Sequence, residues 1–161
     1  SSVYMRKVLT KEAYERLRQE LHELKTKERA AVASAIAEAR EKGDLRENAE
    51  YAAARERQRL LEAQIAELEA LLAQSQVIDL STIDTSKVGL LATVRLKNRK
   101  TGQELTYQIV PAIEADVRSG KISVESPIGK ALLGKEVGAV VPVQVPAGML
   151  ELEILEIRYE A

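Results

Sequence analysis

Two carboxylates stand three residues apart in a segment that is otherwise rich in helix-forming residues. Asp44 and Glu47 follow Gly43 at a predicted helix start, and residues three apart on a helix share one face. Two interpretations are open. The pair can form a capping box, a common structural motif in which both side chains bond to backbone amides. Alternatively, both carboxylates point outward toward a divalent cation, because Mg2+ prefers hard oxygen ligands.

Such a pair could not form a complete metal site by itself. Mg2+ is typically held by one or two carboxylates together with water and substrate phosphates, so a partner would have to supply the other ligands. The chain has no cysteine and a single histidine, His22. This composition excludes disulfides, thiol catalysis and zinc or iron–sulfur sites built on thiolates.

The acid pair lies between two segments with helical periodicity. From residue 10 to residue 76 the chain has Gly43 as its only glycine and no proline, and strong helix formers dominate. Apolar residues recur three and four apart on both sides of Gly43, as in a coiled-coil seam, although the seam thins at Glu28. Two helices of roughly 45–50 Å, at ~1.5 Å per residue, joined by a tight turn must run antiparallel. We predict a coiled-coil hairpin over residues 6–76, with its tip at residues 42–47.

The second half, residues 77–161, has a different composition. It holds the remaining glycines, all four prolines and many β-branched residues, which favours short strands and turns. The predicted fold class is therefore α+β, with a small, mostly antiparallel sheet domain and one short helix after the hairpin. We expect strands at 90–96, 103–110, 122–124, 140–145 and 150–159, and the short helix at 127–133.

Charge and aromatic content limit how the chain could bind nucleic acid. The net charge is −1, from 24 basic and 25 acidic residues, whereas proteins that bind free nucleic acid are usually strongly basic. The aromatic residues are five tyrosines, which makes a base-stacking platform improbable. We therefore expect any nucleic-acid contact to be local or to act through a partner. No apolar run reaches the ~18–20 residues of a membrane span, and we expect a cytoplasmic protein.

The tip sequence resembles the signature of the GreA family of bacterial transcript-cleavage factors. Residues 38–58 carry most of the resemblance, and Leu9–Thr10, Val77–Asp79 and Ile122–Gly134 support it. It extends from Leu9 to Tyr159. The resemblance implies that residues 77–161 form an FKBP-like domain that docks on bacterial RNA polymerase. It also implies that the coiled coil enters the secondary channel of the polymerase.

The resemblance further implies roles for the residues at and near the tip. Asp44 and Glu47 would help the polymerase to hold an Mg2+ ion and a water at the RNA 3′ end of a backtracked complex. The chain would have no metal site or cofactor of its own. Arg40, Arg55 and Tyr51 would contact the extruded RNA. Their structural alternative is solvated helix surface for the arginines and packing of the tip turn for Tyr51.

A third set of residues lies in the second half. Glu125, Ser126 and Pro127 open the predicted short helix and resemble the polymerase-docking loop of the family. The structural alternative is an ordinary strand-to-helix turn, in which a serine caps the helix and a proline occupies its first turn.

The implied function is stimulation of the RNA-cleavage activity of the polymerase, which makes the chain an activator and not an enzyme. We expect a monomer whose partners are the elongation complex and the nascent RNA 3′ end, with no membrane and no small-molecule substrate. Three alternatives stay open. They are a homologue that inhibits polymerase from the same channel, a structural coiled-coil interaction module, and a prolyl isomerase or chaperone. The last would need an aromatic-lined site, for which residues 77–161 offer only Tyr107 and Tyr159.

Overall fold

The chain folds into two compact units. The structure, a computed structural model, describes residues 6–160, and the side chains of residues 45–48 lie outside that description. Ala13–Gln74 forms the helical unit, and the sheet unit contains the described residues up to Glu12 and from Ser75 onward. The sequence predicts that the hairpin starts at residue 6. Residues 6–12 instead group with the sheet unit, because β1 (Val8–Thr10) pairs in parallel with β2 (Gln76–Ile78).

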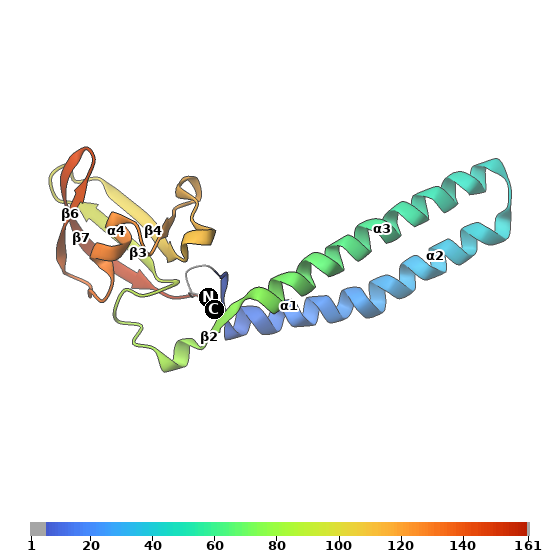
Figure 1. Cartoon of the computed structure of the whole chain (residues 1–161), viewed down its shortest axis with the longest axis horizontal. Helices are drawn as coiled ribbons and strands as arrows, with labels where there is room; N and C mark the ends of the chain where they lie inside the picture. Colours follow the sequence, from blue (N-terminus) through green and yellow to red (C-terminus); the bar gives the residue numbers. More distant parts are fainter. Residues whose placement is uncertain (1–5, 161) are drawn as a thin grey trace. The chain divides into compact units, whose positions relative to one another are not determined.

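The helical unit is an antiparallel hairpin, as predicted. Its first arm contains three consecutive segments, and α3 (Leu45–Gln74) forms the returning arm (Figure 1). The segments of the first arm are α1 (Lys11–Glu23), the π-helix η2 (Leu24–Glu28) and α2 (Arg29–Lys42). The π-helix occupies the part of the sequence where the apolar seam thins.

The two arms are held together by the predicted seam. Five of its buried side chains form one cluster: Val32, Ile36, Ala54, Leu61 and Ile65. Ion pairs also bridge the arms: Arg29 binds Glu62 through two contacts of 2.8 and 2.9 Å, and Lys25 binds Glu69 at 3.1 Å. These pairs are exposed and contribute only about 0.2–1 kcal/mol each, so apolar burial dominates.

No helix in the described part of the chain combines the length and the apolar character needed to cross a membrane.

The sheet unit contains a five-stranded sheet with the order β5-β4-β3-β7-β6. All neighbours are antiparallel except β4 and β5, so the predicted α+β class with a mostly antiparallel sheet is confirmed. The strands are β3 (Thr93–Asn98), β4 (Glu104–Val110), β5 (Lys121–Ser123), β6 (Val140–Val145) and β7 (Gly148–Arg158). Three 3-10 turns lie between strands: η3 (Leu80–Thr82), η4 (Ala112–Glu114) and η5 (Val117–Ser119).

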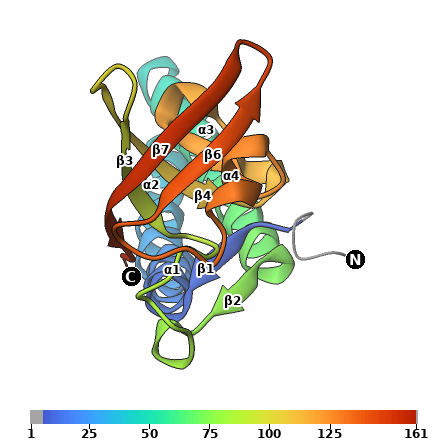
Figure 2. The ribbon, with the colours of Figure 1, turned by 90° about the vertical axis from the view of Figure 1, so that its left-hand side faces the viewer.

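One short helix, α4 (Pro127–Leu132), follows β5 and lies beside β6 (Figure 2). Leu132 is fully buried against the inner face of the sheet, where Leu96, Ile109 and Ile154 are also fully buried. The described range of α4 agrees with the prediction to within one residue. This packing fixes the position of the loop that precedes the helix.

The first predicted strand begins later than expected. The sequence predicts a strand at residues 90–96, but the chain makes a turn first, and β3 starts at Thr93. Leu91 has a φ of 73°, and the Ala92 amide bonds to the Gly89 carbonyl at 3.1 Å. An apolar stretch of this composition has no local signal for a left-handed leucine, which is rare for a residue with a bulky side chain.

Candidate functional site

The tip of the hairpin is a tight turn between α2 and α3. Gly43 ends α2 with a φ of 85°, a left-handed conformation that glycine adopts without steric cost. A β-carbon placed at Gly43 would meet nothing within 4 Å, so the glycine is required by backbone conformation and not by crowding. Asp44 directly precedes the first residue of α3 and is exposed.

Of the two predicted tip acids, only Asp44 has a side chain within the described part of the structure. Asp44 is placed at the outer end of the turn, and Glu47 lies in the first turn of α3, with its side chain outside the described residues. Carboxylates of this kind fit the oxygen ligands that Mg2+ prefers. Among the described side chains, no group of three or more His, Cys, Asp or Glu residues could hold a metal ion.

Arg40 and Tyr51 lie opposite each other on the two arms, next to the tip. The Arg40 guanidinium stands 5.6 Å from the centroid of the Tyr51 ring, within the range of a cation–π contact. Its Nη2 also lies 3.5 Å from the Tyr51 hydroxyl, a long distance for a hydrogen bond. The contact holds the two side chains side by side on the surface of the hairpin.

The same contact changes the acidity of Tyr51. Hydrogen bonding from Arg40 lowers the pKa of the Tyr51 phenol below its ordinary value, and the charges of Arg40 and Arg55 act in the same direction. Arg55 is exposed, four residues after Tyr51 on α3. The structure thus brings the three predicted RNA-contact residues together as one basic, partly aromatic surface below the tip.

A further ion pair near the tip was missed in the sequence. Lys42, the last residue of α2, lies 3.5 Å from the carboxylate of Glu50 on α3. Both side chains are about half exposed, so the pair contributes little to stability. Its signal in the sequence is weak, because the partners face each other only once the register of the two arms is known.

The predicted docking loop in the sheet unit has a clear structural role at Ser126. Its Oγ accepts a hydrogen bond from the Gly129 amide at 3.1 Å and donates one to the Ser123 carbonyl at 2.6 Å. Ser126 is thus the N-cap of α4. A β-carbon at Gly129 would collide with the Ser123 carbonyl, so helix and strand approach each other closely here. Glu125 and Pro127, on either side, are exposed.

Comparison with protein families covers both units. The family model described as "Transcription elongation factor, N-terminal" matches residues 7–77. The model described as "Transcription elongation factor, GreA/GreB, C-term" matches residues 83–159. The chain belongs to the GreA/GreB family of transcription elongation factors. The resemblance found in the tip sequence is confirmed over nearly the whole chain.

Curated members of the GreA/GreB family match over almost their full length. The chain is 52% identical over 150 residues to the transcription elongation factor GreA of Amoebophilus asiaticus (strain 5a2), covering 93% of this chain and 96% of the relative. It is 53% identical over 152 residues to GreA of Alkalilimnicola ehrlichii, covering 94% and 96%. The match therefore spans nearly the full length of both relatives.

Solved structures of GreA/GreB relatives also match. The GreA factor homolog 1 (Gfh1) protein of Thermus thermophilus is 32% identical with a TM-score of 0.45, covering 95% of this chain and 99% of that chain. The elongation factor GreA/GreB of Nitrosomonas europaea is 23% identical with a TM-score of 0.44, covering 96% and 98%. Both TM-scores are low, so the family assignment rests on the sequence matches.

Proposed function

We propose that this elongation factor binds bacterial RNA polymerase and stimulates cleavage of the nascent RNA in backtracked complexes. Its coiled-coil hairpin would enter the secondary channel, and elongation would resume from the new RNA 3′ end. The observation that carries the proposal is the exposed Asp44 at a turn enforced by Gly43, in a chain of the GreA/GreB family. Acting there would place the protein in the cytoplasm.

The tip acids would work jointly with the polymerase. Asp44 and Glu47 would supply carboxylate oxygens to an Mg2+ ion whose remaining ligands belong to the polymerase and the RNA. When bound, that ion supplies charge stabilisation and activation of water for phosphodiester hydrolysis. The contribution of this chain is to place two negative charges at the end of a narrow helical hairpin. In this proposal it is an activator with no hydrolytic site of its own.

The surface below the tip would hold the RNA. Arg40 and Arg55 carry positive charge on opposite arms, and such charges bind phosphates independently of sequence. Tyr51 lies against Arg40, and in this proposal its ring would stack on or pack against an RNA base. These contacts would hold the RNA 3′ end in line with the acids.

The sheet unit would provide the attachment to the polymerase. Glu125 and Pro127 are exposed beside the start of α4, which is capped by Ser126 through its bonds to Ser123 and Gly129. In this proposal Ser126 supports the docking surface, and its neighbours contact the partner.

The test is RNA cleavage in stalled, backtracked elongation complexes that carry 5′-labelled RNA, with Mg2+, in the presence and absence of this protein. We expect shortened labelled RNA, released 3′ fragments and restored elongation on addition of nucleotides. Slower nucleotide addition without fragments would contradict the proposal and identify an inhibitory homologue. Absence of both binding and cleavage would leave only a coiled-coil interaction module.

A further inference from the structure

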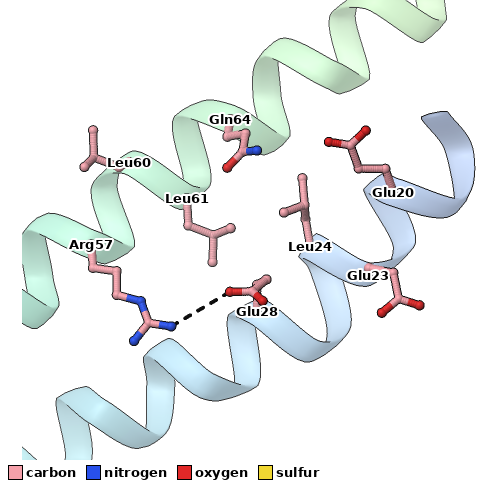
Figure 3. A pocket seen from close by; sticks show the side chains of 8 residues that line it. All are labelled: Glu20, Glu23, Leu24, Glu28, Arg57, Leu60, Leu61 and Gln64. Carbon is pink, nitrogen blue, oxygen red and sulfur yellow. Dashed lines mark ion pairs between the residues drawn. The ribbon is translucent and has the colours of Figure 1, made fainter.

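A groove opens between the two arms of the helical unit, well away from the tip along the sequence. It has a volume of about 470 Å3 and is lined by residues of α1, η2 and α3. Figure 3 shows Leu24 and Leu61 pointing into the space between the arms, with Glu20 and Glu28 on the first arm. Leu61 belongs to the buried seam, whereas Leu24 is only partly buried.

The groove coincides with the π-helical segment. The Arg29 amide bonds to the Leu24 carbonyl, five residues back, which is one residue wider than an α-helical turn. The Thr26 hydroxyl also donates to the His22 carbonyl at 2.7 Å, and such back-bonding bends helices. Leu24, the first residue of this π-helix, is only partly buried and lines the groove. Single π-turns inside α-helices occur frequently at functional sites.

On the α3 side the groove is lined by two leucines, Leu60 and Leu61, together with the polar side chains of Arg57 and Gln64. Leu60 lines the groove and is 55% exposed, whereas its neighbour Leu61 is 7% exposed. Leu60 therefore contributes little to the seam between the arms. Leu60 stands beside Arg57 and Arg59 on a helix that is otherwise rich in charged residues. Its exposed side chain offers an aliphatic contact to a partner.

Three carboxylates line the groove, and they differ in whether a nearby cation neutralises them. Glu23 pairs with Lys27 at 3.0 Å. Glu28 pairs with Arg57 at 3.8 Å, and both side chains are more than half exposed, so that pair is weak. Among the described residues, the Glu20 side chain has no hydrogen-bond or ion-pair partner. The groove thus combines an aliphatic floor with an acidic rim.

We propose that this groove receives an amphipathic helix of RNA polymerase that carries an aliphatic side chain next to a lysine or arginine. The aliphatic group would fit against Leu24 and Leu61 between the arms, with the exposed Leu60 at the outer edge of α3. The cation would meet Glu20. Helices commonly bind in apolar grooves through side chains on one face, and the charges of this rim select a basic helix. The inference rests on the proposed function, because it names a contact of the hairpin with the same polymerase.

The affinity of the full-length protein for purified polymerase elongation complexes tests the groove. We expect Leu60→Ser and Glu20→Lys each to weaken binding by about fivefold or more, as anchor contacts do. Glu67→Lys is the matched control, because Glu67 is an exposed α3 carboxylate outside the groove; its affinity should stay within about twofold. Circular dichroism should show the same helix content and melting temperature for all variants, because both groove residues are exposed.

The outcomes separate this inference from the proposed function. Unchanged affinity of both groove variants, with wild-type RNA cleavage intact, overturns the groove contact and leaves the cleavage function standing. Failure of the wild type to bind or cleave overturns both. If the wild type sediments as a dimer and Leu60→Ser makes it monomeric, the occupant is a second copy and the polymerase contact is wrong.

The absence of cysteine from the sequence makes a direct identification possible. Gln64→Cys introduces a single thiol at the groove, to which a photo-crosslinker can be attached before binding to polymerase. Mass spectrometry should recover a polymerase peptide from a helix with an aliphatic residue beside a lysine or arginine. Recovery of an acidic peptide, or of a peptide of this chain, would overturn the proposal.

Discussion

Asp44 and Tyr51 show how much of the site depends on single side chains. Asp44 is held at the outer end of the turn by the left-handed Gly43, and Tyr51 is held against Arg40 from the other arm. The residue types were recognisable in the sequence because the tip motif is long and specific. The contact between Arg40 and Tyr51 was not, since it depends on the register between the two arms.

The first residue-scale prediction concerns the acids. Replacing Asp44→Asn together with Glu47→Gln should leave polymerase affinity unchanged and abolish stimulated RNA cleavage, because both amides keep the shape but lose the metal-binding charge. Glu41→Gln, on the exposed surface of α2, makes the same chemical change outside the pair and should cleave normally. If the double variant cleaves like wild type, the metal-assisting role is wrong. A loss of stability of about 1 kcal/mol without loss of cleavage would show that the pair is only a helix cap.

The second prediction concerns the pKa of Tyr51. Arg40→Gln should raise it toward the ordinary value, because the guanidinium that stabilises the phenolate is lost. The measurement is an ultraviolet titration of the phenolate band, with Tyr51→Phe identifying the contribution of that residue. An unshifted titration would show that Arg40 does not hold the ring in solution.

The sign of the pH effect on stability follows from the lowered pKa. The contact with ionised Tyr51 stabilises the fold above the unfolded-state pKa, and this contribution is lost as the pH falls through the lower, folded-state pKa. Arg40→Gln should therefore reduce stability more at alkaline pH than at neutral pH. A larger effect at neutral pH would contradict this origin.

At the scale of elements, local sequence signals were sufficient where the determining contacts are local. Gly43 ends α2, Ser126 caps α4, and the turn at Asn98–Gly102 joins β3 and β4, with the Gly102 amide bonding to the Asn98 carbonyl at 2.7 Å. In each case a glycine or a short polar side chain satisfies the backbone within a few residues. The π-turn at residues 24–28 was visible only as a weakening of the seam.

The docking loop yields an element-scale prediction with two distinct effects. Ser126→Ala should lower the unfolding free energy of the sheet unit by about 1 kcal/mol, because the Gly129 amide loses its cap. Glu125→Lys should leave stability within about 0.5 kcal/mol, as surface substitutions usually do, and should lower polymerase affinity. Thermal unfolding and binding to immobilised polymerase provide the two measurements.

The two variants distinguish the structural role of Ser126 in capping α4 from a direct contact of Glu125 with the polymerase. A substitution at Ser126 cannot test docking alone, because the same side chain holds α4 in place. Unchanged polymerase affinity of Glu125→Lys would remove this loop from the proposed docking surface. An unchanged melting temperature of Ser126→Ala would show that the cap is dispensable.

The whole chain has almost balanced charge, and this limits its modes of binding. With a net charge of −1, it should not bind free RNA or DNA measurably at physiological salt, because counterion release favours strongly basic proteins. It should still bind elongation complexes under the same conditions. Gel-shift assays with the backtracked RNA alone, and with the intact complex, make the comparison. A salt-sensitive shift of naked RNA would contradict binding through the polymerase.

The division of the chain into two units was predicted from its composition. The exact boundary between the units depends on the pairing of strand β1 with strand β2. Helix formers end and β-branched residues begin near residue 77, which is where α3 gives way to β2. The sequence had no signal for the parallel pairing of β1 with β2, nor for the bond from the Val8 amide to the Glu114 carboxylate at 2.9 Å. These contacts join segments far apart in the chain, so they leave no local periodicity.

The sequence alone determined the hairpin, the α+β class and the family, because periodicity, glycine placement and a long motif are properties of neighbouring residues. The role of the tip acids stays a prediction. Only the tertiary structure decided which side chains meet across the two arms, the late start of β3 at a left-handed Leu91, and the groove at the π-turn. Those features arise from packing between segments that are distant in the chain. They depend on the geometry of both segments at once, and the local sequence of one segment does not determine it.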